Sequence, residues 1–327
     1  MSFDWNARPC LVTGGAGFGG SHLCAELLRR GSKVYVLDRV FPRNCYLAVE
    51  GLDSRVEFIQ GDIRDLDLLR LTIERYEIDS IFHLAAQPIA PMSNVLPFET
   101  LSVNALGTYT VLEAMRTTRS AKTLVFASSG AHYGATTTDK AIGEDDALCP
   151  AVNLYGPSKT AADVVVRTYA TVYGLGTAVC RFMNTYGPGD TNFSRIVPRA
   201  IRSLLQGEPY DFGNRDDGST RLDFLHIRDM TGAYISVAEH MEVAKGEAFN
   251  FGRGQPVSTG TVARLASRCF DGREREPLFH GAKNHKPVVK YLDIRKAKNL
   301  LGWEPQTTLE QGLTETIDWY RRHLTAL

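Results

Sequence analysis

The sequence predicts an α/β fold in which a doubly wound parallel sheet is followed by a smaller, mixed α/β region toward the C-terminus. Two observations predict the sheet: nearly all-apolar runs alternate with stretches of helical periodicity, and these runs lack the polar alternation of a half-exposed strand. A third observation predicts the smaller region, because glycine and proline punctuate shorter segments from about residue 183 onward. We therefore expect one domain over residues 1–182, with a strand or helix near 223–252 returning to it, and a second region over 183–327.

The apolar runs predict six strands, and the amphipathic stretches predict the helices. The expected strands are 9–12, 33–37, 56–59, 78–84, 123–127 and 177–182. The expected helices are 21–30, 66–75, 97–115, 153–173, 197–206, 228–241, 265–270 and 309–323. Right-handed crossovers would bring the carboxyl ends of the strands to one edge, where ligands bind in a Rossmann-type fold.

Composition limits the classes of partner. The 327 residues carry 37 Lys+Arg and 37 Asp+Glu, so bulk charge predicts neither nucleic-acid nor anionic-membrane binding. No apolar run reaches about 18 residues, and no secretory signal is visible at the N-terminus. The six cysteines are scattered, without metal-ligand spacing, and are typical of reduced thiols. We expect a cytoplasmic protein with no metal site and no membrane span.

Three glycines follow the first apolar run, at Gly14, Gly17 and Gly20. In a strand–turn–helix, the first permits the turn, the second lets the backbone approach a pyrophosphate, and the third allows close helix packing. The helix N-terminus then presents free N–H groups to the phosphates. A bare structural turn is the alternative, but a second strand follows and ends at Asp38. This context predicts a dinucleotide site.

Two carboxylates at strand ends refine this prediction. Asp38 can accept hydrogen bonds from both ribose hydroxyls and repels a 2′-phosphate, which favours NAD over NADP. The adjacent Arg39 could soften this preference, although an arginine there is more often solvated. Asp62, after the third strand, either hydrogen-bonds an adenine or caps the following helix.

A candidate catalytic pair begins the helix expected at 153–173. Tyr155 and Lys159 are four residues apart and therefore share one helix face. A lysine cation nearby favours the phenolate form of a tyrosine, whose ordinary pKa is near 10. Ser129, at the end of the fifth strand, could hold a substrate oxygen during proton transfer. Together with a nicotinamide cofactor, these groups predict removal of a proton and a hydride from an alcohol carbon.

Several segments carry a resemblance to a known family over nearly the whole chain. They are TGGAGF at 13–18, GDIRD at 61–65, HLAAQ at 83–87, the serines at 128–129 with YG at 133–134, YGPSK at 155–159, RFMNTYGP at 181–188, and Asp293, KA at 296–297 and LGWEP at 301–305. In this order they resemble the extended short-chain dehydrogenase/reductases, in particular the NAD-dependent nucleotide-sugar epimerases and dehydratases.

The resemblance implies a bound NAD, a nucleotide-sugar substrate and a homodimer formed by the helices near 97–115 and 153–173. The implied cofactor-binding residues are Gly14, Gly17, Phe18, Gly19, Gly20, Asp38, Asp62, Ile63, Ala85, Ala86, Gln87, Tyr155 and Lys159. The implied substrate-binding residues are Ser93, Ser129, Asn184, Arg195, Ile196, Val197 and Arg221. Asn184 would contact the diphosphate, Ser93 would line the sugar pocket, and 191–197 would wrap the nucleotide. Leu222 separates Arg221 from the following Asp-Phe, unlike the family pattern, so its contact with the diphosphate stays open.

The chain departs from the family directly after Ser129. Dehydratases of this family carry an acidic pair there and decarboxylases usually a glutamate, whereas this chain has Gly130-Ala131. This favours an epimerase, and we expect it to act at C4 through a transient keto-sugar. Other segments, namely 190–198, His226 and 301–305, look more like the CDP-glucose 4,6-dehydratase branch.

His132 keeps the alternatives open. It is either a structural histidine or an acid/base that replaces the missing carboxylates. The hypotheses are thus a C4 epimerase, a 4,6-dehydratase or decarboxylase, and a regulatory module that binds NAD without turnover. His226 is expected to pack against the helix that follows it.

Overall fold

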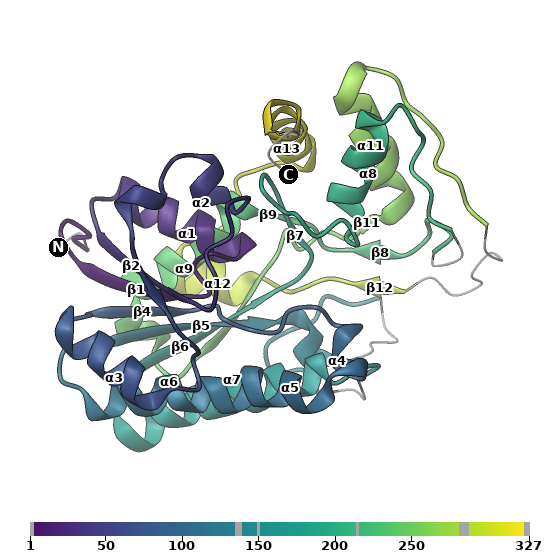
Figure 1. Cartoon of the computed structure of the whole chain (residues 1–327). Helices are drawn as coiled ribbons and strands as arrows, with labels where there is room; N and C mark the ends of the chain where they lie inside the picture. Colours follow the sequence, from purple (N-terminus) through teal and green to yellow (C-terminus); the bar gives the residue numbers. More distant parts are fainter. Residues whose placement is uncertain (1–2, 135–138, 149–150, 214–215, 281–287, 324–327) are drawn as a thin grey trace.

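The computed structural model describes residues 3–134, 139–148, 151–213, 216–280 and 288–323. In this part of the chain, seven parallel strands form one sheet in the order β10-β6-β5-β4-β1-β2-β3 (Figure 1). The strands are β1 (Pro9–Thr13), β2 (Lys33–Asp38), β3 (Glu57–Gln60), β4 (Ser80–His83), β5 (Thr123–Ser129), β6 (Gly176–Phe182) and β10 (Ala248–Phe251). The predicted α/β fold with a doubly wound parallel sheet is confirmed.

Helices cover both faces of the sheet (Figure 1). One face carries α1 (Phe18–Arg29), α9 (Ile227–Glu239), α10 (Met241–Ala244) and α12 (Arg295–Leu301), and the other carries α3 (Leu66–Arg75), α6 (Gly107–Thr117) and α7 (Tyr155–Tyr173). Alternate strand residues pack into the two cores, one on each face of the sheet, because successive side chains of a strand point to opposite faces. Val12 and Phe82 lie in one buried cluster, whereas Leu11 and Ile81 lie in the other.

The strand order reverses between β1 and β4. Strand β1 pairs with β2 on one side and with β4 on the other, and Thr13 lies opposite His83 at the carboxyl end of the second pairing. Helices leave in opposite directions at such a switch point, which opens a crevice outside the strand ends.

A smaller region lies beyond this edge (Figure 1). Its three-stranded sheet has the order β11-β8-β12, and a separate pair joins β7 to β9. These elements are β7 (Thr185–Tyr186), β8 (Arg221–Leu222), β9 (Leu225–His226), β11 (Val257–Ser258), β12 (Val289–Lys290), α8 (Ile196–Leu205), α11 (Thr259–Asp271) and α13 (Leu309–His323). The three helices share a core in which Ile201, Val262 and Ile317 are fully buried.

The remaining short elements connect these layers. They are α2 (Tyr46–Val49), α4 (Met92–Val95), α5 (Pro97–Leu101), the 3₁₀ turns Asp53–Arg55 and Gly130–Tyr133, and a π-helical turn at Ser102–Leu106. The helix expected at 97–115 is therefore divided by the π turn between α5 and α6. Within the described ranges, every helix is too short or too polar to cross a lipid bilayer.

One helix of the C-terminal half has another start than expected, and the strand β10 lies within the range 223–252 from which a strand or helix was expected to return to the sheet. Helix α11 starts at Thr259 rather than 265, because the Ser258 hydroxyl accepts a hydrogen bond from the Thr261 amide (3.0 Å) and caps it. Strand β10 continues the large sheet by pairing with β6. Its Asn250 interrupts the apolar pattern, but the Asn250 side-chain amide is fully buried and donates to the Ile142 carbonyl (2.9 Å).

Candidate active site

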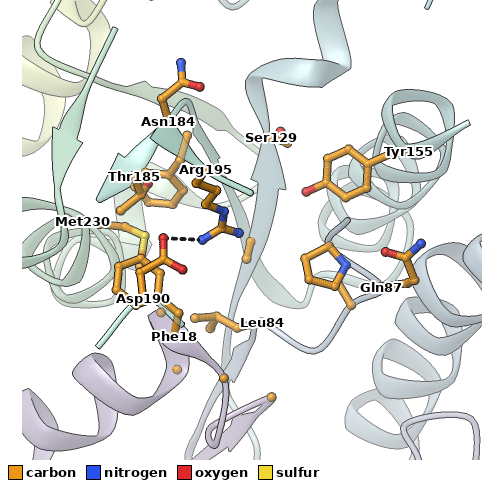
Figure 2. Close-up of a pocket in the computed structure, with 18 of the residues that line it drawn as sticks. Phe18, Leu84, Gln87, Ser129, Tyr155, Asn184, Thr185, Asp190, Arg195 and Met230 are labelled. Atoms are coloured by element: carbon orange, nitrogen blue, oxygen red, sulfur yellow. Dashed lines mark hydrogen bonds and ion pairs between the residues drawn. The ribbon is translucent and has the colours of Figure 1, made fainter. Parts of the chain in front are cut away.

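A cavity of about 1050 Å³ opens at the switch point, between the sheet edge and the smaller region (Figure 2). This volume lies at the upper end of the range for single-ligand pockets, so it has room for an extended ligand or two adjoining ones. The predicted residues in its wall are Gly14, Gly17, Phe18, Gly19, Gly20, Asp38, Asp62, Ile63, Ala85, Ala86, Gln87, Ser129, Tyr155, Lys159, Asn184, Arg195, Ile196 and Val197. Ser93 and Arg221 lie outside this lining.

The glycine turn forms one end of the wall. Gly14 has φ +72°, and a Cβ there would lie only 2.6 Å from the Ala85 amide nitrogen. A Cβ on Gly20 would collide with the Gly14 carbonyl, so both positions require glycine. Helix α1 has Gly17 at its N-cap, no side-chain cap and no acidic residue in its first turn. Its N-terminal amides therefore suit the pyrophosphate of a dinucleotide.

Asp38 ends β2 beside this turn. Its Oδ2 accepts from the Ala16 amide (3.2 Å) and its Oδ1 from the Arg39 amide (2.8 Å). Each carboxylate oxygen keeps a further lone pair, so two hydroxyls of a ribose can still donate to it. Burial raises the pKa of Asp38 against the lowering effect of these amides. This environment fits the adenosine ribose of NAD.

Asp62 lines the same end of the cavity but does not cap the next helix. Its carboxylate holds Arg64 through two contacts, Nε to Oδ1 (2.9 Å) and Nη2 to Oδ2 (2.7 Å), and these keep the pKa of Asp62 low. The cap of α3 is Asp65, which accepts from the Leu68 amide (2.9 Å). The alternative that Asp62 caps this helix is therefore wrong.

Tyr155 begins α7 and points its hydroxyl into the cavity (Figure 2). Its amide donates to the Ser93 hydroxyl oxygen (3.0 Å) and to Asn153 Oδ1 (3.1 Å), and Ser93 in turn donates to the Ala90 carbonyl (2.6 Å). Ser93 is fully buried, and its hydroxyl contacts the main chain of Tyr155 rather than the side chain. It therefore helps to fix the position of the tyrosine from behind. Ser93 lies outside the cavity wall, and its contact with a sugar stays a prediction.

Lys159 lies one turn later and is only 3% exposed. Its ammonium donates to the Ala127 carbonyl (2.8 Å) and lies 4.9 Å from the centre of the Phe126 ring. Burial lowers the pKa of Lys159 to about 7.

The tyrosine itself differs from expectation. Burial raises the pKa of Tyr155, and the groups that oppose this are a hydrogen bond with Ser129 and the charge of Arg195. The Ser129 oxygen accepts from the Ala131 amide (3.1 Å), which leaves its proton available to the tyrosine or to a substrate oxygen. The two groups that oppose this rise in the tyrosine pKa are therefore Ser129 and Arg195.

The opposite wall comes from residues 184–199. Asn184 has φ +43° and donates from Nδ2 to the Asp223 carbonyl (3.1 Å). Arg195 precedes α8 and reaches the centre of the cavity, where its Nη1 pairs with Asp190 Oδ2 at 3.0 Å (Figure 2). A guanidinium in this place suits a diphosphate.

Other residues in the wall were not predicted. They include Asp190, Arg199, Tyr210, Phe212, Phe224 and Met230. Arg199 follows Arg195 by one helical turn, which was an available signal. The aromatic residues come from segments punctuated by glycine and proline, where the sequence carries no periodicity to place them.

The residues after Ser129 form a 3₁₀ turn, Gly130–Tyr133, that does not contribute to the wall. His132 is 7% exposed, and its Nδ1 lies 3.8 Å from Asp163 Oδ2. Burial lowers its pKa to about 4, so this imidazole is neutral at physiological pH. The structural alternative for His132 agrees with this position. His226 is also buried and accepts from the Arg228 amide (3.4 Å) at the start of α9.

Comparison with known proteins agrees with this geometry. A UDP-glucose 4-epimerase of Halalkalibacterium halodurans is 30% identical, over 96% of this chain and 96% of its own length. An Arabidopsis thaliana trifunctional UDP-glucose 4,6-dehydratase/UDP-4-keto-6-deoxy-D-glucose 3,5-epimerase/UDP-4-keto-L-rhamnose-reductase is 31% identical over 98% of this chain, which spans about half (48%) of that longer protein. The crystal structure of UDP-glucose 4-epimerase with UDP-glucose from Thermotoga maritima superposes with a TM-score of 0.86 and 29% identity, covering 97% of this chain and 100% of that one.

The family model with the description "NAD dependent epimerase/dehydratase family" matches residues 10–252. That range holds the glycine turn, Asp38, Ser129, Tyr155 and Lys159. The prediction of NAD as the cofactor is confirmed by this match and by the fit of the turn and Asp38 to a dinucleotide. The chain belongs to the NAD-dependent epimerase/dehydratase family.

Proposed function

We propose that the protein is a nucleotide-sugar epimerase that inverts C4 of a hexose through a transient keto-sugar. The observation that carries this proposal is the composition of the cavity wall beside Tyr155. Two hydroxyls, those of Tyr155 and Ser129, lie there with Lys159, and the described residues next to Ser129 offer no carboxylate or imidazole to the cavity. Such a wall suits a reaction that moves one hydride and one proton.

The carboxylates elsewhere in the described wall are already engaged. Their contacts are Asp38 with main-chain amides, Asp62 and Glu99 with Arg64, Asp190 with Arg195, and Asp216 with the Thr259 hydroxyl (2.6 Å). A 4,6-dehydratase needs groups that remove a proton at C5 and deliver one to the hydroxyl leaving C6. This wall supplies them poorly, which favours epimerisation over dehydration.

The chain's own residues divide the chemistry between them. Ser129 would donate to the C4 oxygen and hold it near Tyr155, which takes the hydroxyl proton as a general base. When bound, NAD supplies the reversible hydride acceptor. Tyr155 would return the proton after the keto-sugar has turned its other face. Asn184 and Arg195 would hold the diphosphate throughout, so that the intermediate stays in the cavity.

The test is incubation of the purified protein with UDP-, CDP-, GDP- and dTDP-hexoses, followed by mass spectrometry and chromatography. We propose UDP-sugars as the first candidates, because the structural relative of similar fold holds UDP-glucose. An isomer of unchanged mass supports the proposal. A product lighter by one water or one CO₂ would instead assign the dehydratase or decarboxylase alternative. If a Tyr155→Phe variant without enzymatic turnover keeps the effect of the protein in the cell, the regulatory alternative is favoured.

We also propose that the protein forms a homodimer through α5, the π turn, α6 and α7. These elements pack side by side and present exposed apolar side chains, of which Phe98 is 83% exposed, with Leu101, Leu106 and Val164 also exposed. Light scattering should give twice the chain mass, and a Phe98→Asp variant should reduce it. We further propose that the protein is cytoplasmic and that its two regions divide near residue 183.

A further inference from the structure

The catalytic lysine poses an electrostatic problem. Lys159 is buried, and its ammonium donates to a neutral carbonyl, that of Ala127 (2.8 Å), and lies near the ring of Phe126. Burial of an ammonium without a counter-charge favours its neutral form. A neutral amine would no longer stabilise a tyrosinate at Tyr155. A negative charge in the surroundings would favour the charged form of Lys159 against this effect of burial.

A buried carboxylate lies one helical turn further along α7. Asp163 is fully buried, and its Oδ2 accepts from the Ser128 hydroxyl (2.8 Å) and from Arg181 Nε (2.9 Å). Its Oδ1 accepts from Arg181 Nη2 (2.8 Å). A bidentate fork of this kind fixes the carboxylate in one orientation. Ser128 lies between Ala127, which holds Lys159, and the catalytic Ser129, so Asp163 also fixes the end of β5.

Arg181 also makes hydrogen bonds through the nitrogen that does not bind Asp163. Arg181 Nη1 donates to the Tyr133 hydroxyl (2.9 Å) and to the Glu144 carbonyl (3.0 Å). The Tyr133 hydroxyl donates in turn to Asn250 Oδ1 (2.6 Å). These contacts occupy the one guanidinium nitrogen that does not bind Asp163, so Arg181 is fixed in place against the carboxylate. Of the two charges of this pair, Asp163 is the one that acts on the pKa of Lys159.

We propose that Asp163 is a positioning residue for the catalytic pair, whose buried carboxylate holds the Lys159 ammonium in its charged form and anchors the strand end that carries Ser129. The effect of Asp163 on turnover rests on the proposed epimerase function. The effect of Asp163 on the charge of Lys159 does not depend on that function. Asp163 contacts neither substrate nor cofactor, since it lies outside the cavity wall.

The other titratable groups around Lys159 do not supply this charge. His83 of β4 is fully buried with its pKa lowered to about 3, and His132 has its pKa lowered to about 4, so both are neutral. Tyr155 on the same helix has a raised pKa and is neutral before catalysis. Arg181 and Arg195 are cations and could only oppose the charge on Lys159. In the described surroundings, Asp163 is the group that raises the pKa of Lys159 against burial.

The direct test is a proton titration of the Lys159 side-chain nitrogen by NMR on selectively ¹⁵N-lysine-labelled protein, with Lys159→Met to assign the signal. In Asp163→Asn, the midpoint should fall by at least about one pH unit, the size expected for loss of an opposite charge nearby. His132→Val is the matched control, because it changes a neutral neighbour of the same carboxylate and should leave the midpoint in place. An unchanged midpoint in Asp163→Asn would overturn the proposal.

A second variant covers the case in which Asp163→Asn does not fold because Arg181 loses its partner. The double variant Asp163→Asn/Arg181→Gln removes both buried charges together, which is far less destabilising than removing one. Its Lys159 midpoint should fall as well, and an unchanged midpoint would again overturn the proposal.

Turnover provides the second readout. With the sugar that the enzyme isomerises, the alkaline limb of the kcat profile should move to lower pH in Asp163→Asn, and Asp163→Glu should restore it while KM stays constant. A loss of kcat that is equal at every pH, with the alkaline limb in place, would leave only the anchoring of the strand end and overturn the proposal that Asp163 holds the charge of Lys159. If no nucleotide sugar is isomerised, the proposed function fails, while the NMR titration still decides the inference.

Discussion

Replacement of Gly14 by alanine is the sharpest test of the glycine turn. Gly14 has φ +72°, a conformation that costs an L-residue about 1–2 kcal/mol. The new Cβ would also lie 2.6 Å from the Ala85 nitrogen and 2.7 Å from its Cα, both backbone atoms that cannot turn away. Overpacking of this kind adds about 1–3 kcal/mol. The folded state should therefore lose about 2–5 kcal/mol, as the sum of the two costs.

The turn must move away from Ala85 to relieve the contact, and it carries the amides that face the pyrophosphate. We expect NAD affinity to fall by at least about tenfold, equivalent to about 1.4 kcal/mol. Urea unfolding measures the first quantity and calorimetric titration with NAD measures the second.

Gly51→Ala is the matched control. Gly51 has φ +67°, nearly the same strain, but a Cβ there meets nothing within 4 Å. This variant should lose only about 1–2 kcal/mol of stability and keep its NAD affinity. If the two variants lose the same stability and bind NAD equally well, the close approach of Gly14 to Ala85 has no energetic role and the reasoning is refuted.

Three further outcomes are expected. Tyr155→Phe should retain NAD but lose about 10²–10⁴-fold in kcat, the usual contribution of a general acid–base, as measured by isomer formation. Ser258→Ala should destabilise the protein by about 1 kcal/mol in urea unfolding through loss of the α11 cap, with unchanged NAD binding. Burial lowers the pKa of His22 to about 4, so the unfolded chain takes up the proton first as pH falls below 6.5. Stability should then decrease between pH 6.5 and about 4 by up to about 1.4 kcal/mol per pH unit, and His22→Gln should make this slope shallower.

The sheet and the glycine turn could be predicted because their signals are local. The nearly all-apolar run at 123–127 depends on neighbouring residues, and the turn closed by Gly14 and Gly20 depends on backbone sterics. The boundaries of α5, the π turn and α6 depend instead on packing against α7, which no single-chain periodicity contains. The start of α11 escaped prediction because the Thr-Gly-Thr sequence has low helix propensity and is stabilised there by burial.

The site shows the same limit. Tyr155 and Lys159 are linked by helix spacing, so the sequence placed them on one face. The pKa of Tyr155 depends instead on Ser129 and Arg195, which come from other elements. The pairing of Asp163 with Arg181 forms only when α7 packs on β6. The pairing of Arg195 with Asp190 depends on the conformation of the segment 184–199. Ser93 illustrates the reverse case, since its position behind Tyr155 depends on the fold of α4 rather than on any motif.

The place of β10 at the sheet edge has a consequence for synthesis on the ribosome. Strand β6 ends at Phe182, but its neighbour β10 begins at Ala248, so β6 emerges with an unpaired edge. At about 5–20 residues per second, that edge would stay open for roughly 3–13 s. The buried Arg181 also waits for this strand, because Asn250 holds the tyrosine to which Arg181 donates. A nascent chain that stalls between these two strands thus exposes a further strand edge able to pair with another chain, and a chaperone that covers this edge would protect it.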